Sequence, residues 1–212
     1  MVLQKDGLVL ASDRDSYVGQ KIGKLTDWRF LDSIFEGPDY SAMMLPRLWQ
    51  SDRGSARRAI MMVGAAIPDD GIPSDSAIVL LIDPEKEFTE ILQRGRIGVS
   101  GESYAFNRDG QLISESRFDK DLRDIGLISP DQRGILNLEV RNPGGNMVEG
   151  HQPELDRHSQ PFTRMAKSAI AGHSDFDLDG YNDYRGVPVV GVWTWSEALG
   201  LGITTEMDVA EA

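Results

Sequence analysis

The stretch Tyr181-Asn-Asp-Tyr-Arg-Gly-Val-Pro-Val-Val-Gly-Val-Trp-Thr-Trp195, followed by Gly200-Leu-Gly-Ile-Thr-Thr-Glu-Met-Asp208, decides the fold class. Arg185-Gly186 predicts a tight turn, because glycine adopts the positive φ that such turns need. Side chains alternate between the two faces of a strand. The pattern therefore puts Val187, Val189, Trp193 and Trp195 on one face and Val190, Val192 and Thr194 on the other.

A second run upstream has the same character. Residues 103–106 and 111–117 read as two strands, and Asp109-Gly110 between them is a strong signal for a hairpin turn. Together the two runs predict a small antiparallel sheet that carries aromatic side chains. Such a sheet suits a ligand-sensing module better than an enzyme.

The first part of the chain predicts a second sheet. A hairpin is expected around Asp6-Gly7, and residues 43–49 and 59–67 read as paired strands. Residues 77–82 are apolar on both faces, which indicates a central strand. Helices are expected over residues 28–35 and after Asp83-Pro84, where aspartate caps the helix and proline occupies its first position.

These elements predict two α+β units with antiparallel sheets. The first unit covers residues 1–95 and the second covers residues 96–212. The second unit contains a long irregular stretch, residues 118–173, with one helix expected over residues 162–170. The two halves are not repeats at the level of residues, but their elements follow a similar order.

Composition restricts the function further. The net charge of −12 argues against nucleic acid and anionic lipid as partners, because both require basic surfaces. The absence of cysteine excludes disulfides, thiolate catalysis and cysteine-ligated metals. No apolar run approaches the roughly 20 residues of a membrane span, and no secretion signal is visible. The hairpin that begins almost at residue 1 favours an excised part of a longer protein over a complete cytosolic one.

The chain resembles a known sensor family in three places. Residues 6–13, with Tyr17-Val-Gly-Gln20, are similar to the opening of an extracytoplasmic Cache (PAS-like) domain. Residues 100–118 resemble the start of a second, membrane-proximal Cache unit, and residues 179–212 resemble its closing strands. The long helix that usually precedes the first sheet is absent here.

The resemblance implies a double-Cache input domain of a bacterial transmembrane receptor. Such a domain lies outside the inner membrane, is anchored by flanking helices and feeds a kinase, a cyclase or a chemotaxis output. It would bind a small molecule and is compatible with a homodimer. Amino-acid-binding members carry an Arg-x-Trp-Tyr constellation; Arg47 and Trp49 match in part, but Gln50 replaces the tyrosine.

The candidate ligand site combines aromatic rings, hydroxyls and arginines. Arginine binds a carboxylate through two hydrogen bonds, and tyrosine adds oriented ones, so an anionic or amphipathic small molecule is expected. The second-unit candidates are Tyr104, Phe106, Ser114, Ser116, Arg117, Tyr181, Asp183, Tyr184, Arg185, Trp193 and Trp195. About half of the aromatic rings are expected simply to pack the core. Replacing Arg117 or Arg185 by alanine should weaken an anionic ligand without unfolding the chain.

A second pocket is expected in the first unit. Arg47 and Trp49 would line it together with residues 61–65, and Met43, Met44, Met61 and Met62 would make it adaptable. The alternative for these methionines is ordinary core packing.

Two metal sites are weaker hypotheses. Asp175, Asp177 and Asp179 precede Gly180 at the alternate positions of a calcium loop, but Gly186 stands where that loop needs a glutamate. The alternative is a solvated acidic turn. His151, Glu154 and His158 would share one face of a helix and could bind zinc, although Pro153 makes a helix there uncertain.

No nucleophile elbow, phosphate loop or dinucleotide motif is present. Ser114 and Ser116 share a strand face, with no histidine at a predictable position to activate them. The sequence therefore predicts a non-enzymatic sensor without a required cofactor. The rivals are a calcium-dependent structural module, a hydrolase, and a spacer that binds no ligand.

Overall fold

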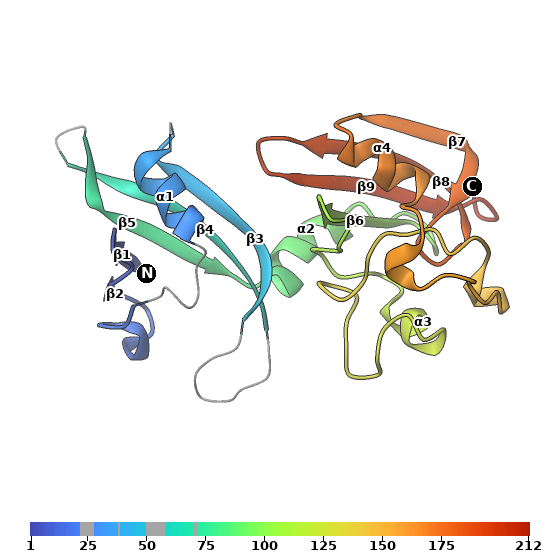
Figure 1. The fold of residues 1–212 in the computed structure, drawn as a ribbon, viewed down its shortest axis with the longest axis horizontal. Coiled ribbons are helices and arrows are strands. Elements are labelled where there is room, and N and C mark those ends of the chain that lie inside the picture. Colours follow the sequence, from blue (N-terminus) through green and yellow to red (C-terminus); the bar gives the residue numbers. More distant parts are fainter. Residues whose placement is uncertain (22–27, 38, 50–57, 70–71) are drawn as a thin grey trace. The chain divides into compact units, whose positions relative to one another are not determined.

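The computed structural model describes residues 1–21, 28–37, 39–49, 58–69 and 72–212. The chain divides into two compact units, Met1–Asp83 (unit 1) and Pro84–Ala212 (unit 2). Each unit has one antiparallel sheet and few helices, so the fold is α+β (Figure 1). The boundary expected from the sequence lies near residue 95. The observed one is earlier, because the helix that follows Asp83 packs against the first strand of unit 2.

Unit 1 has a five-stranded sheet in the order β2-β1-β5-β4-β3. Its strands are β1 (Val2–Gln4), β2 (Val9–Ala11), β3 (Ser41–Trp49), β4 (Arg58–Asp69) and β5 (Ile72–Ile82). The β1–β2 hairpin turns at Gly7, whose φ is 82°, as its sequence predicts. β5 lies between β1 and β4, which confirms it as a central strand.

One face of this sheet is covered by α1 (Trp28–Glu36); a short 3₁₀ turn, η1 (Asp15–Tyr17), precedes that helix. Phe30 and Ile34 of α1 lie so close to Gly64 of β4 that a side chain at position 64 would collide with both. The opposite face is also apolar, and Ile78 and Leu80 on it are 52% and 59% exposed. The described residues thus cover one of the two apolar faces of β5.

Unit 2 has a four-stranded sheet in the order β6-β9-β8-β7. Its strands are β6 (Glu102–Asn107), β7 (Asp175–Asn182), β8 (Pro188–Ser196) and β9 (Leu201–Asp208). Gly186, with φ of 79°, closes the β7–β8 turn by donating its N–H to the Asp183 carbonyl. Val189, Trp193 and Trp195 are buried while Val192 is exposed, which confirms the predicted alternation.

The predicted hairpin over residues 103–117 forms only in part. The turn at Gly110 is present, with φ of 75°, but residues 111–117 do not form a full strand, and β6 pairs with β9 instead. Leu112 donates its N–H to the Leu138 carbonyl and accepts one from Leu136. The segment after residue 134 therefore takes the backbone hydrogen bonds that a second hairpin strand would have made.

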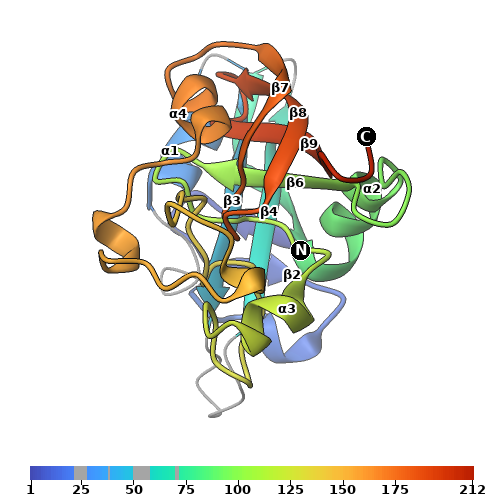
Figure 2. The ribbon, with the colours of Figure 1, turned by 90° about the vertical axis from the view of Figure 1, so that its right-hand side faces the viewer.

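Short helices and irregular chain complete unit 2. They are the π-helical turn η3 (Pro84–Phe88), α2 (Thr89–Gln93), α3 (Asp119–Asp124), η4 (Met147–Glu149), η5 (Arg157–Ser159) and α4 (Arg164–Ile170). Thr163 caps α4 by accepting the Ala166 N–H, as threonine commonly does. α4 lies against β7, β8 and β9, as both views show (Figures 1 and 2). It therefore covers the face of the sheet that carries the tryptophans.

Candidate functional site

The six predicted aromatic residues of unit 2 meet in its core. Rings pack edge-to-face between Tyr104 and Tyr184 and between Tyr181 and Trp193, with centroids 5.4 and 5.8 Å apart. Phe106 and Trp195 form a third pair at 6.5 Å. The whole set is buried against α4 and the segment that precedes it: Tyr104, Phe106, Tyr181, Tyr184, Trp193 and Trp195. The structure thus brings these residues together, chiefly as packing.

Two tryptophans of this face keep an unused donor. The indole N–H groups of Trp193 and Trp195 are buried and have no hydrogen-bond partner among the described residues. Both side chains project from β8 on the core side of the sheet. Buried donors are normally satisfied, so two orphaned ones on adjacent inward positions indicate a place where an external acceptor would gain affinity.

The same sheet carries a row of three carboxylates, of which only Asp177 was a candidate from the sequence, as a calcium ligand. Glu102 of β6 stands directly opposite Glu206 of β9, and Gly191 and Asp177 continue the same row across β8 and β7. The three acidic side chains are each less than 5% exposed. The signal was available: period two puts Glu102 on the face of Tyr104, and Glu206 on that of Thr204.

Hydroxyl groups satisfy the two glutamates. Tyr104 and Tyr181 donate to the two oxygens of Glu206, at 2.8 and 2.6 Å. Tyr184 donates to Glu102 Oε2 at 2.5 Å and also bonds Ser116. Burial raises the pKa of Glu206 to about 8 and raises the pKa of Glu102 above its ordinary value. The glutamates thus anchor two buried hydrogen-bonded sets on neighbouring strands, Glu206 with Tyr104 and Tyr181, and Glu102 with Tyr184 and Ser116.

Arg185 sits in a buried ionic cluster. Its guanidinium donates to Asp183 Oδ2 at 2.7 Å and to Asp208 Oδ1 at 3.0 Å, and it stacks on the Phe118 ring at 3.5 Å. Asp183 also accepts the backbone N–H groups of Arg185 and Val187. Burial alone would lower the pKa of Arg185, but the neighbouring carboxylates raise it above its ordinary value. The cation is therefore already neutralised within the protein.

Arg117 and the two serines are also engaged. The Arg117 guanidinium donates to the carbonyls of Gly101 and Gly98, at 2.6 and 3.1 Å. Its backbone N–H donates to Glu102. Ser114 accepts the Ala105 N–H, and Ser116 accepts that of Phe118. These contacts are structural, and the predicted roles of these residues in ligand binding remain predictions.

The loop bonded by Arg117 is held from its other side by the chain's last residues. Val99 and Ser100 donate their backbone N–H groups to Glu211, at 2.7 and 2.6 Å. The Ser100 hydroxyl donates to the same carboxylate and accepts the Asp208 N–H. Loop 98–101 is therefore clamped between Arg117 and Glu211.

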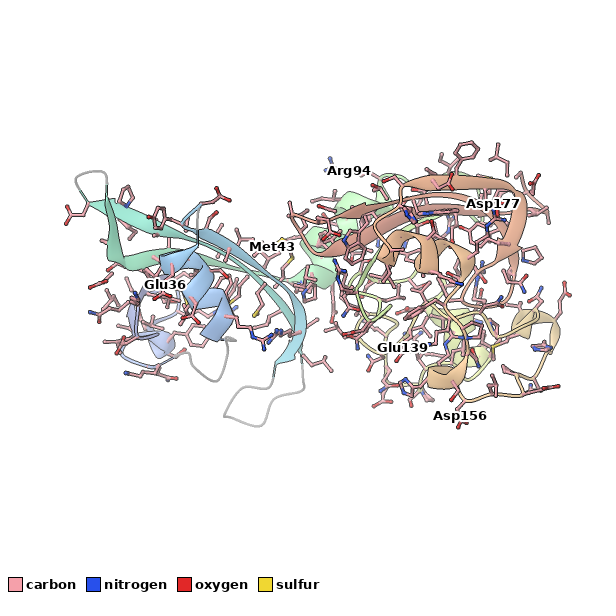
Figure 3. The ribbon with its side chains drawn as sticks, turned by 45° about the horizontal axis from the view of Figure 1, so that its top comes forward. Glu36, Met43, Arg94, Glu139, Asp156 and Asp177 are labelled. Carbon is pink, nitrogen blue, oxygen red and sulfur yellow. The ribbon has the colours of Figure 1, made fainter. Side chains whose placement is uncertain are left out.

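In unit 1, Arg47 is exposed on β3. The side chain of Trp49 lies outside the described part. Met44 and Met62 face each other across β3 and β4 and belong to the core under α1. Met43, labelled in Figure 3, precedes Met44 on β3 and pairs with Val63 of β4. Burial in the core thus accounts for three of the four methionines, Met44, Met61 and Met62, and the predicted pocket is untested.

The acidic turn has a structural role. Asp177, labelled on β7 in Figure 3, accepts the N–H groups of Asp179 and Gly180 and pairs with Arg164 of α4 at 2.5 Å. Asp175 and Asp179 are exposed, whereas Asp177 is buried. The β7–β8 register shifts between Asp177 and Tyr181, so Asp179 lies within a bulge and Asp175 and Asp177 lie before it. In the described part of the chain no group of three acidic or histidine side chains converges on a metal position, and calcium binding stays untested.

The helix required by the zinc hypothesis is absent from residues 151–156. His158 instead contacts Glu139 at 2.6 Å, and His151 contacts the Pro143 carbonyl at 3.1 Å. Pro153 explains the difference, because proline disfavours a helical interior. Nearby, an open hollow of about 450 Å³ is lined by Asp121, Asp124, Ile125, Met147, Val148, Gly150, His151 and Gln152. His151 of the zinc hypothesis lines it, whereas none of the predicted ligand-binding residues does.

Comparison with solved structures identifies the fold. The chain is 12% identical to the periplasmic sensory domain of the Campylobacter jejuni chemoreceptor Tlp1, with a TM-score of 0.50, covering 90% of this chain and 58% of that one. The chain is 13% identical to the extracellular domain of rpHK1S-Z16, assigned as a histidine kinase, with a TM-score of 0.53, covering 98% of this chain and 68% of that one. It is 12% identical to the ligand-binding domain of the C. jejuni chemoreceptor Tlp3 in complex with 4-methylisoleucine, with a TM-score of 0.53, covering 99% of this chain and 64% of that one.

These matches confirm the Cache-like, α+β fold expected from the sequence. The chain spans 58% to 68% of the length of these three structures. No protein-family profile and no curated protein sequence matches the chain. Among the described residues, no helix is both long and apolar enough to span a membrane.

Proposed function

We propose that this chain is the extracytoplasmic, small-molecule-sensing part of a bacterial transmembrane signalling receptor. The observation that carries the proposal is the shared architecture. The alignment covers 98% of this chain with the extracellular domain of rpHK1S-Z16 and 99% with the ligand-binding domain of the chemoreceptor Tlp3, which is in complex with 4-methylisoleucine. The hydroxyls of the two candidate serines are occupied by structural contacts: Ser114 accepts a backbone N–H, and Ser116 bonds Tyr184 and accepts a backbone N–H.

The ligand class follows from the unused donors of unit 2. The indole N–H groups of Trp193 and Trp195 are buried without acceptors among the described residues, so a ligand that carries a carboxylate or carbonyl oxygen would satisfy them. The aromatic side chains already fill this face, so the ligand must enter by parting α4 from the sheet. Amino acids and small carboxylates are therefore the first compounds to test.

The mechanism is a shift between two arrangements of unit 2. A ligand bonded to the tryptophans favours the arrangement in which α4 has moved, and differential affinity of about 1–3 kcal/mol is typical of such coupling. β9 then carries the change to Asp208, which is bonded to both Arg185 and Ser100. Flanking helices outside this chain would pass the change across the membrane.

The test is isothermal titration calorimetry of the chain with the common amino acids and small dicarboxylates. We expect at least one compound to bind, and Trp193→Phe and Trp195→Phe to weaken it, because each loses one donor and keeps an aromatic ring. Trp49→Phe is the matched control in unit 1. Loss of affinity only in Trp49→Phe would move the site to unit 1, and no binding by any compound would refute sensing of this class.

A further inference from the structure

The two buried glutamates of unit 2 lie in an arrangement that is unfavourable for two charges. Glu102 and Glu206 face each other directly on neighbouring strands and are 2% and 3% exposed. Like charges in directly opposite positions destabilise a sheet, and burial greatly increases that cost. Their four oxygens accept from the hydroxyls of three tyrosines and from the Arg117 backbone N–H. Among the described residues no cation is hydrogen-bonded to either carboxyl group.

The cations near the pair offset its charge only in part. Arg185 lowers the pKa of Glu102 through space and Arg96 is coupled electrostatically to Glu102, yet burial keeps the pKa of Glu102 above its ordinary value. Asp183, which follows β7, adds a further negative charge that disfavours ionisation of Glu206. Arg185 is committed to Asp183 and Asp208, and the Arg117 guanidinium is committed to two backbone carbonyls. Several titratable or polar groups face the pair from the elements packed on it. They are Tyr104 on β6, Thr204 on β9, Tyr181 and Asp177 on β7, Arg164 of α4 (paired with Asp177), Asp183, Tyr184 and Arg185 in the β7–β8 turn, Arg96 and Ser116. Gly191 of β8, opposite Glu206, adds no side chain.

We propose that the folded unit 2 keeps one proton on the Glu102–Glu206 pair, so that acidification tightens the unit and alkaline conditions loosen it. A protonated glutamate fits this site, because a tyrosine hydroxyl can accept a hydrogen bond as readily as it donates one. The carboxyl oxygens of Glu102 and Glu206 therefore keep their hydrogen bonds to the tyrosine hydroxyls when one of these oxygens gains a proton. This inference concerns unit 2 alone and is independent of the small-molecule function.

The direction in which pH changes the stability of unit 2 follows from the difference between the folded and unfolded pKa of Glu206. Burial raises the pKa of Glu206 to about 8, with Asp183 and Glu102 adding to the rise, while an unfolded glutamate titrates near 4.5. Between these values the folded unit binds more protons than the unfolded chain. Its extra stability is therefore complete below about pH 4.5 and is lost as the pH rises towards about 8. The two carboxyls titrate as a pair, so the measured midpoint belongs to both.

The proton-binding pair is connected to the clamped loop. Glu102 accepts the Arg117 N–H, the Arg117 guanidinium holds the carbonyls of loop 98–101, and Glu211 holds the amides of the same loop. Loss of the proton held by the pair would put a second negative charge next to these bonds. The pair is thus placed to change the hold on the end of β9 as the external pH changes.

The experiment measures chemical unfolding of the chain from pH 5 to pH 8.5 by tryptophan fluorescence. A Trp28→Phe, Trp49→Phe background leaves Trp193 and Trp195 as reporters of unit 2. We expect the unfolding constant to rise by up to tenfold per pH unit over this range, and Glu206→Gln to remove most of that dependence. Glu149→Gln, at an exposed carboxyl group, should leave the profile unchanged. Parallel profiles for the parent and Glu206→Gln would overturn the proposal.

A second measurement covers the case in which Glu206→Gln does not fold. The parent protein, labelled with ¹³C at its glutamate carboxyl carbons, is titrated by NMR. We expect a carboxyl resonance that titrates well above pH 6, in contrast to those of exposed glutamates. If every glutamate resonance of the folded chain titrates below about pH 5.5, the pair holds no proton at neutral pH and the inference fails.

Discussion

Arg185→Ala tests whether the ionic cluster holds unit 2 together. The guanidinium is the shared partner of Asp183 and Asp208, and Arg185 and Asp183 are 3% and 1% exposed. Removing one partner of a buried ion pair leaves an uncompensated charge and costs about 3–5 kcal/mol. For a domain the size of unit 2, that loss lowers the unfolding midpoint by about 10 °C or more. The structure thus replaces the expectation from sequence that this substitution leaves the fold intact.

The assay is thermal unfolding followed by the fluorescence of Trp193 and Trp195, in the background that lacks the two unit 1 tryptophans. The lowering of the unfolding midpoint by Arg185→Ala should be smaller near pH 4, because Asp183, which has lost its arginine partner, can then bind a proton. The double variant Arg185→Met, Asp183→Asn should recover part of the loss, since it removes both charges together. A midpoint for Arg185→Ala within about 2 °C of the parent at pH 7 would refute the assignment of this cluster as a structural support.

Three other changes probe the same unit. Asp177→Ala should lower the unfolding midpoint by several degrees in EDTA, because two turn amides and an arginine lose their acceptor; stabilisation of the parent by calcium that vanishes in the variant would instead show ion binding. Gly191→Ala should cost about 1–3 kcal/mol by denaturant titration, because the new Cβ would lie 2.9 Å from Glu206 Cγ, and an unchanged midpoint would contradict that crowding. Glu211→Ala should speed hydrogen exchange at the two amides that its carboxylate binds and leave α4 unaffected; unchanged exchange would show that the clamp does not form in solution.

The elements that follow local rules could be predicted from the sequence. Gly186 and Gly7 mark turns because both need positive φ, and the strand pattern of β8 separates buried tryptophans from exposed Val192. α1 was predictable from its apolar spacing and the glycine that follows it. The fate of residues 111–117 was not, because their partner lies more than 20 residues away, near Leu138.

The roles of the candidate site residues remain predictions. The six aromatic residues of unit 2 all lie in one buried cluster, whereas about half were expected to pack the core, because their packing depends on α4 and on chain segments far apart in sequence. The sequence near Arg185 predicts a cation available to a ligand, because it does not show that Asp208 on β9 accepts a hydrogen bond from the guanidinium. Period two places each glutamate on the inward face of its own strand, but that they meet in one row depends on the register of four strands.

The clamp at loop 98–101 couples this loop mechanically to the end of the chain at Glu211, although the two are far apart in sequence. Ser100 and Glu211 are 111 positions apart in sequence, yet three hydrogen bonds from the loop converge on that one carboxylate. A pull applied beyond β9 would therefore be shared between the last strand and the start of β6, on which Arg117 also acts through Gly101. Paired spin labels at positions 99 and 210 would keep a constant separation while labels elsewhere in unit 2 report its rearrangement.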